Sequence, residues 1–194
     1  IDNIREYIYY KFDINRDVRI NFFESYTEIW ADIINICLLC FNKKKTTRKK
    51  NRNDSMKKDI LELLNIELKF SLFQCAKVLN YLGYQNFQDF YNYNGFINKT
   101  NKFKQKSNVF SYYIGRSLLF YNFEKFINLC YKFNTGFVIG NKIPSQYFIE
   151  LMEDTINNTD YVQIINIFIK EIKSYKKNDL LKNTMRFTCI EEKI

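Results

Sequence analysis

Residues 56–82, MKKDILELLNIELKFSLFQCAKVLNYL, decide the fold class. Apolar side chains recur in this stretch at every third or fourth position, which is the repeat of one face of an α-helix. The members of the repeat are Ile60, Leu61, Leu64, Leu68, Leu72, Cys75, Leu79 and Leu82. Ser55 precedes the stretch as a candidate N-terminal cap, and Gly83 follows it where a left-handed residue commonly ends a helix. The spacing therefore predicts one long helix over these residues.

The same repeat recurs along most of the chain. Further helices are predicted over about residues 2–22, 26–42, 108–120, 123–133, 144–156, 161–175 and 179–187, with one helical turn over 87–91. The candidate capping residues are Ser25 (in a capping box with Glu28), Asn122 and Asp160, and Pro144 suits a first helical position. Residues 136–140 are the only candidate strand, and a single isolated strand is better interpreted as a buried crossing.

Composition favours the same fold class. Only 5 Gly and 1 Pro occur among 194 residues, which is too few for the many tight turns of a β-sandwich or β-barrel. Hydrophobic residues make up 46% of the chain, which is enough for a packed core. We therefore expect an all-α fold of paired helices, either an α-solenoid or an irregular bundle, in a single domain over residues 1–194. Two basic loops are expected to interrupt it, at residues 43–55 and 98–107.

Positive charge is concentrated in one segment. The net charge is +9, and residues 43–58 alone contain nine basic residues and one acidic residue. Its candidate nucleic-acid contacts are Lys43, Lys44, Lys45, Arg48, Lys49, Lys50 and Arg52. Such cations would bind phosphates weakly and without reading sequence, because the segment contains no aromatic side chain on which a base could stack. The alternative interpretation is a solvated insertion without a ligand.

The residues present argue against catalysis. The chain contains no histidine, which excludes Ser-His-Asp and Cys-His nucleophiles and every zinc site that uses histidine. Cys37 and Cys40 form a C-x-x-C motif, but they lack a second pair and lie in apolar helical sequence, so we interpret them as core cysteines. A set of acidic residues has the spacing of exposed helix faces: Asp13, Asp17, Glu24, Glu28 and Asp32. We expect no catalytic, cofactor-binding or metal-binding residue, and no enzyme.

The five cysteines and the absence of a signal peptide indicate reduced thiols in the nucleus or cytoplasm. No run of about 20 apolar residues is present, so no membrane insertion is expected.

Two cations also flank Val18 in the apolar stripe of the first predicted helix. This arrangement predicts that Arg16 and Arg19 tie that helix to its neighbours through charge-assisted hydrogen bonds.

Three segments together resemble a known family. Residues 12–22, FDINRDVRINF, resemble the pattern W-D-R-T-R-x-I-R-x-D-F, which opens the conserved region of the germinal-centre-associated nuclear protein family of mRNA-export scaffolds. The positions that fit are Asp13, Arg16, Val18, Arg19 and Phe22. Residues 109–119, with Tyr113, are similar to that family's E-F-x-x-Y-x-L-L helix, and residues 148–168, with Tyr161, are similar to its A-L-x-I … G-N-Y-x-x-F-F-x-L pair. The order and rough spacing agree over most of the chain. Ile14 and Asn21 depart from the pattern, and the Lys-rich insertion is additional.

The resemblance implies a non-catalytic helical scaffold with a PCI-like helical repeat (PCI names the proteasome, signalosome and initiation-factor domains). Such a scaffold pairs with a PCI-domain partner and a small acidic subunit in a complex that couples transcription to export at the nuclear pore. A nuclear hetero-complex subunit without a cofactor is therefore expected, and residues 178–194 would begin a C-terminal module. Two other functions remain open: an RNA-contacting structural subunit of a ribonucleoprotein such as an organellar ribosome, and a viral helical-bundle interaction protein.

Overall fold

The computed structural model describes residues 2–45, 52–91, 100, 102–104, 107–133 and 143–190, and within these ranges the fold is all-α. The α-helices are α1 (Asp2–Lys11), α2 (Phe23–Lys45), α3 (Arg52–Tyr81), α4 (Arg116–Tyr121), α5 (Phe123–Phe133), α6 (Ser145–Ile156), α7 (Thr159–Ser174) and α8 (Leu180–Asn183). A 3₁₀ turn, η1 (Phe87–Asp89), follows α3, and a π-helix, η2 (Phe110–Gly115), runs directly into α4. Two isolated bridges are the only β-type pairings in the described part of the chain. The prediction of an all-α fold is confirmed.

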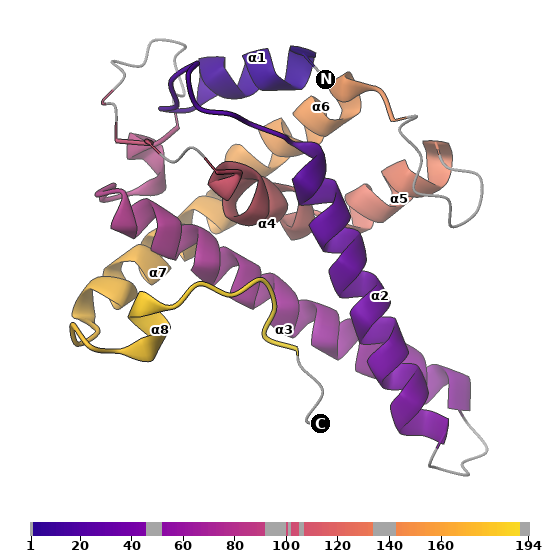
Figure 1. Ribbon diagram of the computed structural model, residues 1–194. Coiled ribbons are helices and arrows are strands. Elements are labelled where there is room, and N and C mark those ends of the chain that lie inside the picture. Colours follow the sequence, from indigo (N-terminus) through magenta and orange to yellow (C-terminus); the bar gives the residue numbers. More distant parts are fainter. Residues whose placement is uncertain are drawn as a thin grey trace.

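The helices pack around α4, which is short and buried (Figure 1). It contacts α2, α3, η2, α5 and α6. The long helix α3 crosses beneath it and packs along α7, while α1 and α6 pair on the opposite side. The far ends of α2 and α3 extend beyond the rest of the bundle, and we call residues 30–45 of α2 and 52–62 of α3 the arm.

The helix predicted over residues 56–82 is present as α3, which begins four residues earlier, at Arg52, and ends at Tyr81. Leu64, Leu72 and Leu79 are buried on its inner face, as the apolar repeat predicted. Gly83 has φ +84°, so the left-handed stop is also confirmed. Ser55 lies within the first turn of α3 and does not cap it, because the helix begins at Arg52.

The first predicted helix is half as long as expected. It ends at Lys11, and the chain then continues without regular helix to Phe22. The backbone N–H of Asp13 donates to the carbonyl of Phe90, and Phe12 and Ile14 form the two bridges, with Tyr91 and Phe103. Distant partners therefore replace the hydrogen bonds that would have continued the helix.

The second helix begins earlier and ends later than predicted: it spans Phe23–Lys45, whereas the sequence indicated about residues 26–42. It starts at Phe23, and the predicted cap Ser25 instead donates its hydroxyl to the carbonyl of Ser111, 2.7 Å away. At the other end, residues 43–45 belong to α2 and residues 52–55 belong to α3. The predicted loop over 43–55 is therefore too long, because Lys and Arg are good helix formers. Residues 46–51 lie outside the described part.

Other predicted helix boundaries need small corrections. Asn158, not Asp160, caps α7, because its side-chain oxygen accepts from the backbone N–H groups of Asp160 and Tyr161. Pro144 is the residue before α6 rather than its first residue. Asn122 directly precedes α5, and its side-chain amide donates to the hydroxyl of Thr155.

The chain after α7 folds back over the bundle. Asp179 caps α8 through the N–H of Leu181, and α8 ends at Asn183, so the predicted helix over 179–187 is too long. Residues 184–190, which we call the strap, then cross α3 without regular secondary structure (Figure 1). The candidate strand at 136–140 and half of the predicted loop at 98–107 lie outside the described residues; within that loop Phe103 is buried.

Candidate functional site

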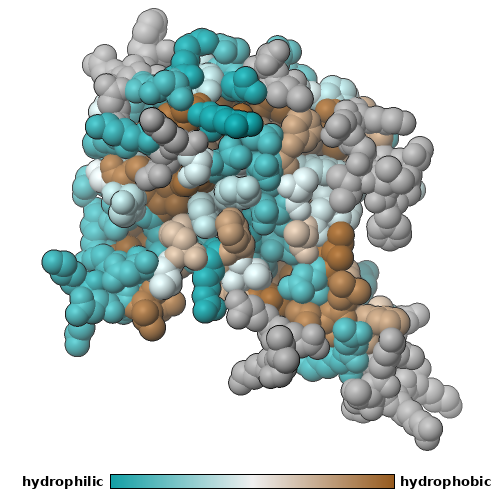
Figure 2. All heavy atoms as spheres, in the orientation of Figure 1, coloured by the Kyte–Doolittle hydropathy of each residue, from teal (hydrophilic) through white to brown (hydrophobic). Residues whose placement is uncertain are grey.

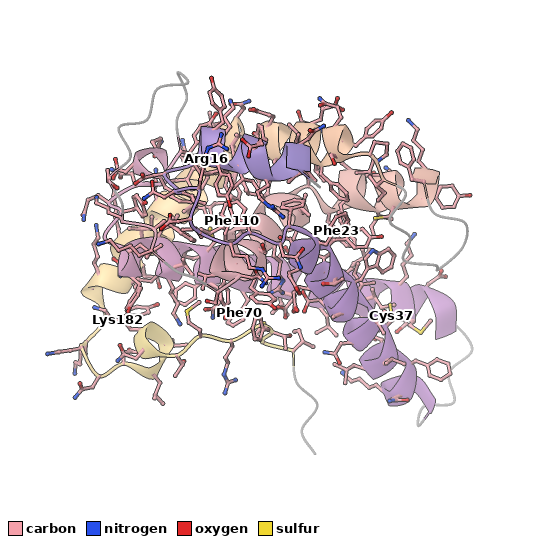
Figure 3. The ribbon with its side chains drawn as sticks, turned by 45° about the horizontal axis from the view of Figure 1, so that its top comes forward. Arg16, Phe23, Cys37, Phe70, Phe110 and Lys182 are labelled. Atoms are coloured by element: carbon pink, nitrogen blue, oxygen red, sulfur yellow. The ribbon has the colours of Figure 1, made fainter. Side chains whose placement is uncertain are left out.

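The three segments that carry the family resemblance contact one another. The rings of Phe12 and Phe110 have centroids 5.4 Å apart, and those of Phe22 and Phe148 are 5.7 Å apart. Figure 3 shows Phe110 in the interior of the bundle. The motif residues Phe22, Tyr113 and Tyr161 are all buried. Segments separated by roughly half the chain therefore form one core.

Asp13 is buried, although the sequence placed it on an exposed helix face. Its carboxylate accepts a hydrogen bond from the hydroxyl of Tyr84 at 2.8 Å and another from the backbone N–H of Thr100 at 2.8 Å. The hydroxyl of Thr100 donates to the same carboxylate. Burial, and then the neighbouring carboxylate, raise the pKa of Tyr84, which keeps the phenol protonated as a donor. Asp13 thus holds the segment after α1 against Tyr84 and Thr100. The prediction that it lies on an exposed helix face was wrong.

Arg16 and Arg19 do not hold the core. Both are exposed, and Arg16 pairs with Glu6 at 2.6 Å across the surface, with 73% of its side chain accessible. The prediction of a structural clamp is wrong because the helix has ended before these residues. Arg16 lies in a turn, in which the backbone N–H of Val18 donates to the carbonyl of Asn15, and from Val18 to Ile20 successive side chains alternate between buried and exposed. Val18, Ile20 and Phe22 point inward, which places Arg19 outside. The alternation of apolar and polar residues over 18–22 was a sequence signal for this arrangement.

A buried ion cluster that the sequence did not predict lies at the centre of the bundle. Arg116 is only 1% exposed, and one guanidinium nitrogen lies 2.5 Å from a carboxylate oxygen of Asp32 and 2.7 Å from one of Glu67. The two carboxylates come from α2 and α3, and the arginine comes from the first residue of α4. Asp32 is the second residue wrongly expected on an exposed face. The available signal was a single arginine within the apolar stretch 109–120.

The buried carboxyl group of Asp32 has a raised pKa. Burial raises its pKa to about 7; Arg116 opposes that rise, and the charge of Glu67 adds to it. Two carboxylates share one guanidinium, so the cluster would carry an excess negative charge if every group were ionised. A protonated Asp32 relieves that excess, since a buried carboxylate is costly to keep charged.

Glu67 also fastens the strap. Its second carboxylate oxygen accepts hydrogen bonds from the hydroxyl of Thr188 at 2.8 Å and from the backbone N–H of Cys189 at 3.1 Å. The guanidinium of Arg116 donates to the carbonyl of Phe187, whose ring stacks on that of Tyr113 with centroids 5.7 Å apart. These hydrogen bonds join the helices to the strap, which indicates a structural role.

The described residues contain no cluster of three or more His, Cys, Asp or Glu side chains that could hold a metal ion. None of the five cysteines, which all belong to the described residues, forms a disulfide; Cys40 is buried, and Cys37 is half-buried on the arm (Figure 3). Burial raises the pKa of the Cys37 thiol, so the thiol is less readily ionised than an exposed one. In the described ranges no helix has the length and apolar content needed to cross a bilayer.

The arm carries an apolar groove of about 420 Å³ on the surface of the described residues. We call it the arm groove, and its lining residues are Trp30, Ile33, Ile34, Cys37, Leu38 and Phe41 from α2 and Met56 and Ile60 from α3. Figure 2 shows hydrophobic side chains gathered along this part of the surface. The sequence analysis interpreted Cys37 as a core cysteine, yet it is only half-buried and lines this groove.

The cations predicted to contact nucleic acid lie at the end of the arm. Lys43, Lys44 and Lys45 form the last turn of α2, and Arg52 begins α3. Lys57 and Lys58 are exposed one to two turns further along α3. The remaining candidates Arg48, Lys49 and Lys50 lie outside the described residues. An apolar groove and a cationic end therefore adjoin on the same arm.

Comparison with known proteins adds no relative: no family model, no curated protein and no solved structure matches the chain.

Proposed function

We propose that this chain is a non-catalytic helical scaffold subunit of a nuclear mRNA-export assembly that pairs with a PCI-domain partner and a small acidic subunit. The observation that carries the proposal is the convergence of residues 12–22, 109–119 and 148–168 on one core. The hydroxyls of Ser117 and Tyr161, from two of these segments, lie 2.9 Å apart. Segments that resemble successive parts of one family's pattern would pack in this way if the chain shared that family's architecture.

The distribution of polar and apolar groups supports a scaffold rather than an enzyme. The buried carboxylates of Asp13, Asp32 and Glu67 all accept hydrogen bonds from groups of the same chain. They are therefore occupied within the fold. The arm, in contrast, leaves large apolar side chains in contact with solvent, which is typical of a surface that binds another protein.

An RNA-contacting subunit of a ribonucleoprotein is a second candidate. It is favoured by the cations at the end of the arm, since residues 43–58 carry nine basic residues against one acidic residue. Such a segment binds phosphate mainly through counterion release, and the affinity falls steeply with salt. The two candidates differ in whether the assembly depends on RNA.

Affinity capture of the tagged chain from its native cells, with and without ribonuclease, distinguishes the two. A scaffold of the proposed kind retains a PCI-domain protein and a small acidic protein in near-stoichiometric amounts after ribonuclease treatment, and the tagged chain lies at the nuclear rim. Recovery of ribosomal proteins that ribonuclease removes would instead identify the ribonucleoprotein subunit. If the capture recovers no PCI-domain protein and the tagged chain is not nuclear, the export proposal is overturned.

A further inference from the structure

We infer that a pocket between α3, η2 and α8 binds a small aromatic carboxylate. We call it the strap pocket, because the first residues of the strap close one of its sides. A scaffold needs no such ligand, so this site is additional to the proposed function. Three properties of the pocket identify the ligand: its size, its apolar lining and its two lysines.

The first property is the size of the pocket. Its volume is about 310 Å³, which is near the lower limit of the range, about 300–1,000 Å³, that is typical of small-molecule sites. Its walls come from three separate parts of the chain: residues 77–82 of α3 and its end, residues 109 and 113 at η2, and residues 182–185 of α8 and the strap. A ligand of one or two rings suits this volume, whereas a folded segment of a partner protein does not.

The second property is the apolar lining. Six of the nine lining residues are apolar or aromatic: Val78, Tyr81, Leu82, Val109, Tyr113 and Met185. Aromatic rings pack favourably against the edges and faces of other rings, and the sulfur of methionine also makes favourable contacts with them. Most of the ligand's surface should therefore be apolar, and an aromatic ring fits the two tyrosines and the methionine.

The third property is positive charge. Lys77 and Lys182 line the pocket, and Lys77 is only 4% exposed (Lys182 is labelled in Figure 3). The ammonium of Lys77 donates to the carbonyl of Thr184, and that of Lys182 donates to the carbonyl of Tyr175 at 3.4 Å. Among the residues that the structure describes, neither ammonium forms an ion pair with a carboxylate. Since each ammonium carries three N–H donors, both can also bind an anion.

Burial makes a counter-charge favourable at this place. It lowers the pKa of Lys77, and the charge of Asp179 opposes that change. A buried cation is costly to keep charged, and a carboxylate bound beside it would repay part of that cost through a charge-assisted hydrogen bond. The surrounding segment adds to the attraction, because residues 173–186 contain five basic residues and one acidic residue.

The two parts of the lining together select the class of ligand. An inorganic anion would satisfy the lysines but would leave the apolar walls uncovered. A hydrocarbon would cover the walls but would bring no counter-charge to Lys77. An aromatic carboxylate satisfies both.

The test uses the whole chain and 2-naphthoate, a two-ring carboxylate, in a titration followed by ligand-observed NMR. We expect a Kd of about 1 mM or lower, the scale for a ligand of about 13 non-hydrogen atoms. Two matched probes each lack one feature: 2-naphthamide has the same shape without the charge, and acetate has the charge without the rings. Both should bind at least about tenfold more weakly than 2-naphthoate.

Variants of the chain locate the site. Lys182→Met should weaken binding of 2-naphthoate by about fivefold or more and should leave binding of 2-naphthamide unchanged, because only the charge is lost. Lys176→Met is the matched control, since Lys176 is exposed on the same segment but does not line the pocket. It should leave both affinities unchanged. Lys77 is kept, because its bond to Thr184 also holds the strap.

A second variant tests the pocket itself. Val109→Phe adds a ring to the wall of the pocket and should abolish binding of both naphthalene probes, because it occupies the space that they need. Circular dichroism and thermal unfolding check that the variant is folded. If it is not, Leu82→Phe serves in its place, because Leu82 also lines the pocket and is half-buried.

Several outcomes would overturn the inference. One is the absence of 2-naphthoate binding to the folded chain, and another is equal binding of 2-naphthamide, which would remove the role of the lysines. Equal weakening by Lys182→Met and Lys176→Met would indicate attraction to the whole basic segment. Binding that persists in the folded pocket-filling variant would place the ligand elsewhere. Capture of the PCI-domain partner is measured separately, so the strap pocket and the scaffold proposal can each fail without the other.

Discussion

The guanidinium of Arg116 lies 2.7 Å from the carboxylate of Glu67, in a region where neither side chain is exposed by more than 1%. The pair joins the start of α4 to the middle of α3, and Asp32 of α2 completes it. Three helices and the strap thus meet at one charged cluster. Because buried charges are costly when their partners are removed, the integrity of the fold depends on all members of the cluster.

Replacing Arg116 by methionine should be among the most damaging single changes. It leaves the carboxylates of Asp32 and Glu67 buried without their cation, and we expect a loss of about 3–5 kcal/mol in the free energy of unfolding. Urea denaturation followed by circular dichroism measures this change. Arg16→Met is the control, because the Arg16–Glu6 pair is exposed, and its loss should change stability by less than about 1 kcal/mol. Equal effects of the two substitutions would contradict the assignment of the cluster.

Stability should depend on pH through Asp32. Its pKa in the folded chain is raised to about 7 from an ordinary value of 3.8, so between these values the folded state binds more protons than the unfolded state. The contribution of Asp32 to stability is therefore complete below about pH 4 and is lost as pH rises toward 7, by at most about 1.4 kcal/mol per pH unit.

Comparison with Asp32→Asn isolates this dependence, because asparagine does not titrate. The difference in unfolding free energy, wild type minus variant, should fall between pH 4 and pH 7 when both proteins are unfolded in urea across that range. A difference that stays constant, or one that rises with pH, would show that Asp32 remains ionised in the folded state.

Gly115 is required by the close approach of η2 to α2. A Cβ atom at this position would lie 2.4 Å from the hydroxyl oxygen of Ser25, whereas the next atom, the Cβ of Ser25, is 3.4 Å away. Gly115→Ala should destabilise the fold by about 1–3 kcal/mol through this overlap.

The double variant Gly115→Ala/Ser25→Ala tests that reason. Without the hydroxyl the main overlap disappears, so the double variant should lose less stability than the sum of the two single variants. Ser25→Ala alone removes the hydrogen bond to the carbonyl of Ser111 and should cost about 1 kcal/mol. Additive effects in thermal or urea unfolding would refute the contact between the two residues.

Weak binding of RNA at low salt is expected to depend on the basic segment. Replacing Arg48, Lys49 and Lys50 by serine should reduce the affinity for a single-stranded RNA and should lower the slope of log K against log salt by about 2, as expected for three fewer phosphate contacts. Fluorescence anisotropy over a salt series measures both. Lys170→Ser/Lys176→Ser/Lys177→Ser removes the same charge from exposed positions elsewhere and should leave more of the slope intact. Equal slopes in the two variants would indicate non-specific attraction to the whole surface.

Helices whose contacts are local could be predicted from the sequence, and segments held by distant partners could not. The apolar repeats of α3, α5 and α7 lie within each helix, and their approximate extents were predicted. The segment after Lys11 was predicted as helix because its partners Tyr91 and Phe103 are about 80 to 90 residues away. Sequence spacing does not reveal such pairings.

The cations of the arm, the arm groove and the Arg116 cluster also differ in whether the sequence reveals them. The concentration of cations at the end of the arm is visible in the sequence. The arm groove is not, because Leu38 and Phe41 continue an apolar repeat and only the packing of α2 reveals which of its faces is covered. Arg116 was overlooked because its partners are 84 and 49 residues away along the chain.

The position of the strap has a consequence for the synthesis of this domain. Glu67 can accept hydrogen bonds from Thr188 and Cys189, and Arg116 can donate to Phe187, only after nearly all the described chain has left the ribosome. Until then their polar atoms lack those partners, and the nascent helices can adopt their local structure without completing the charged centre. Stable folding is therefore expected to wait until residues 187–189 have emerged, and a ribosome stalled before that point should present an incompletely packed, protease-sensitive chain.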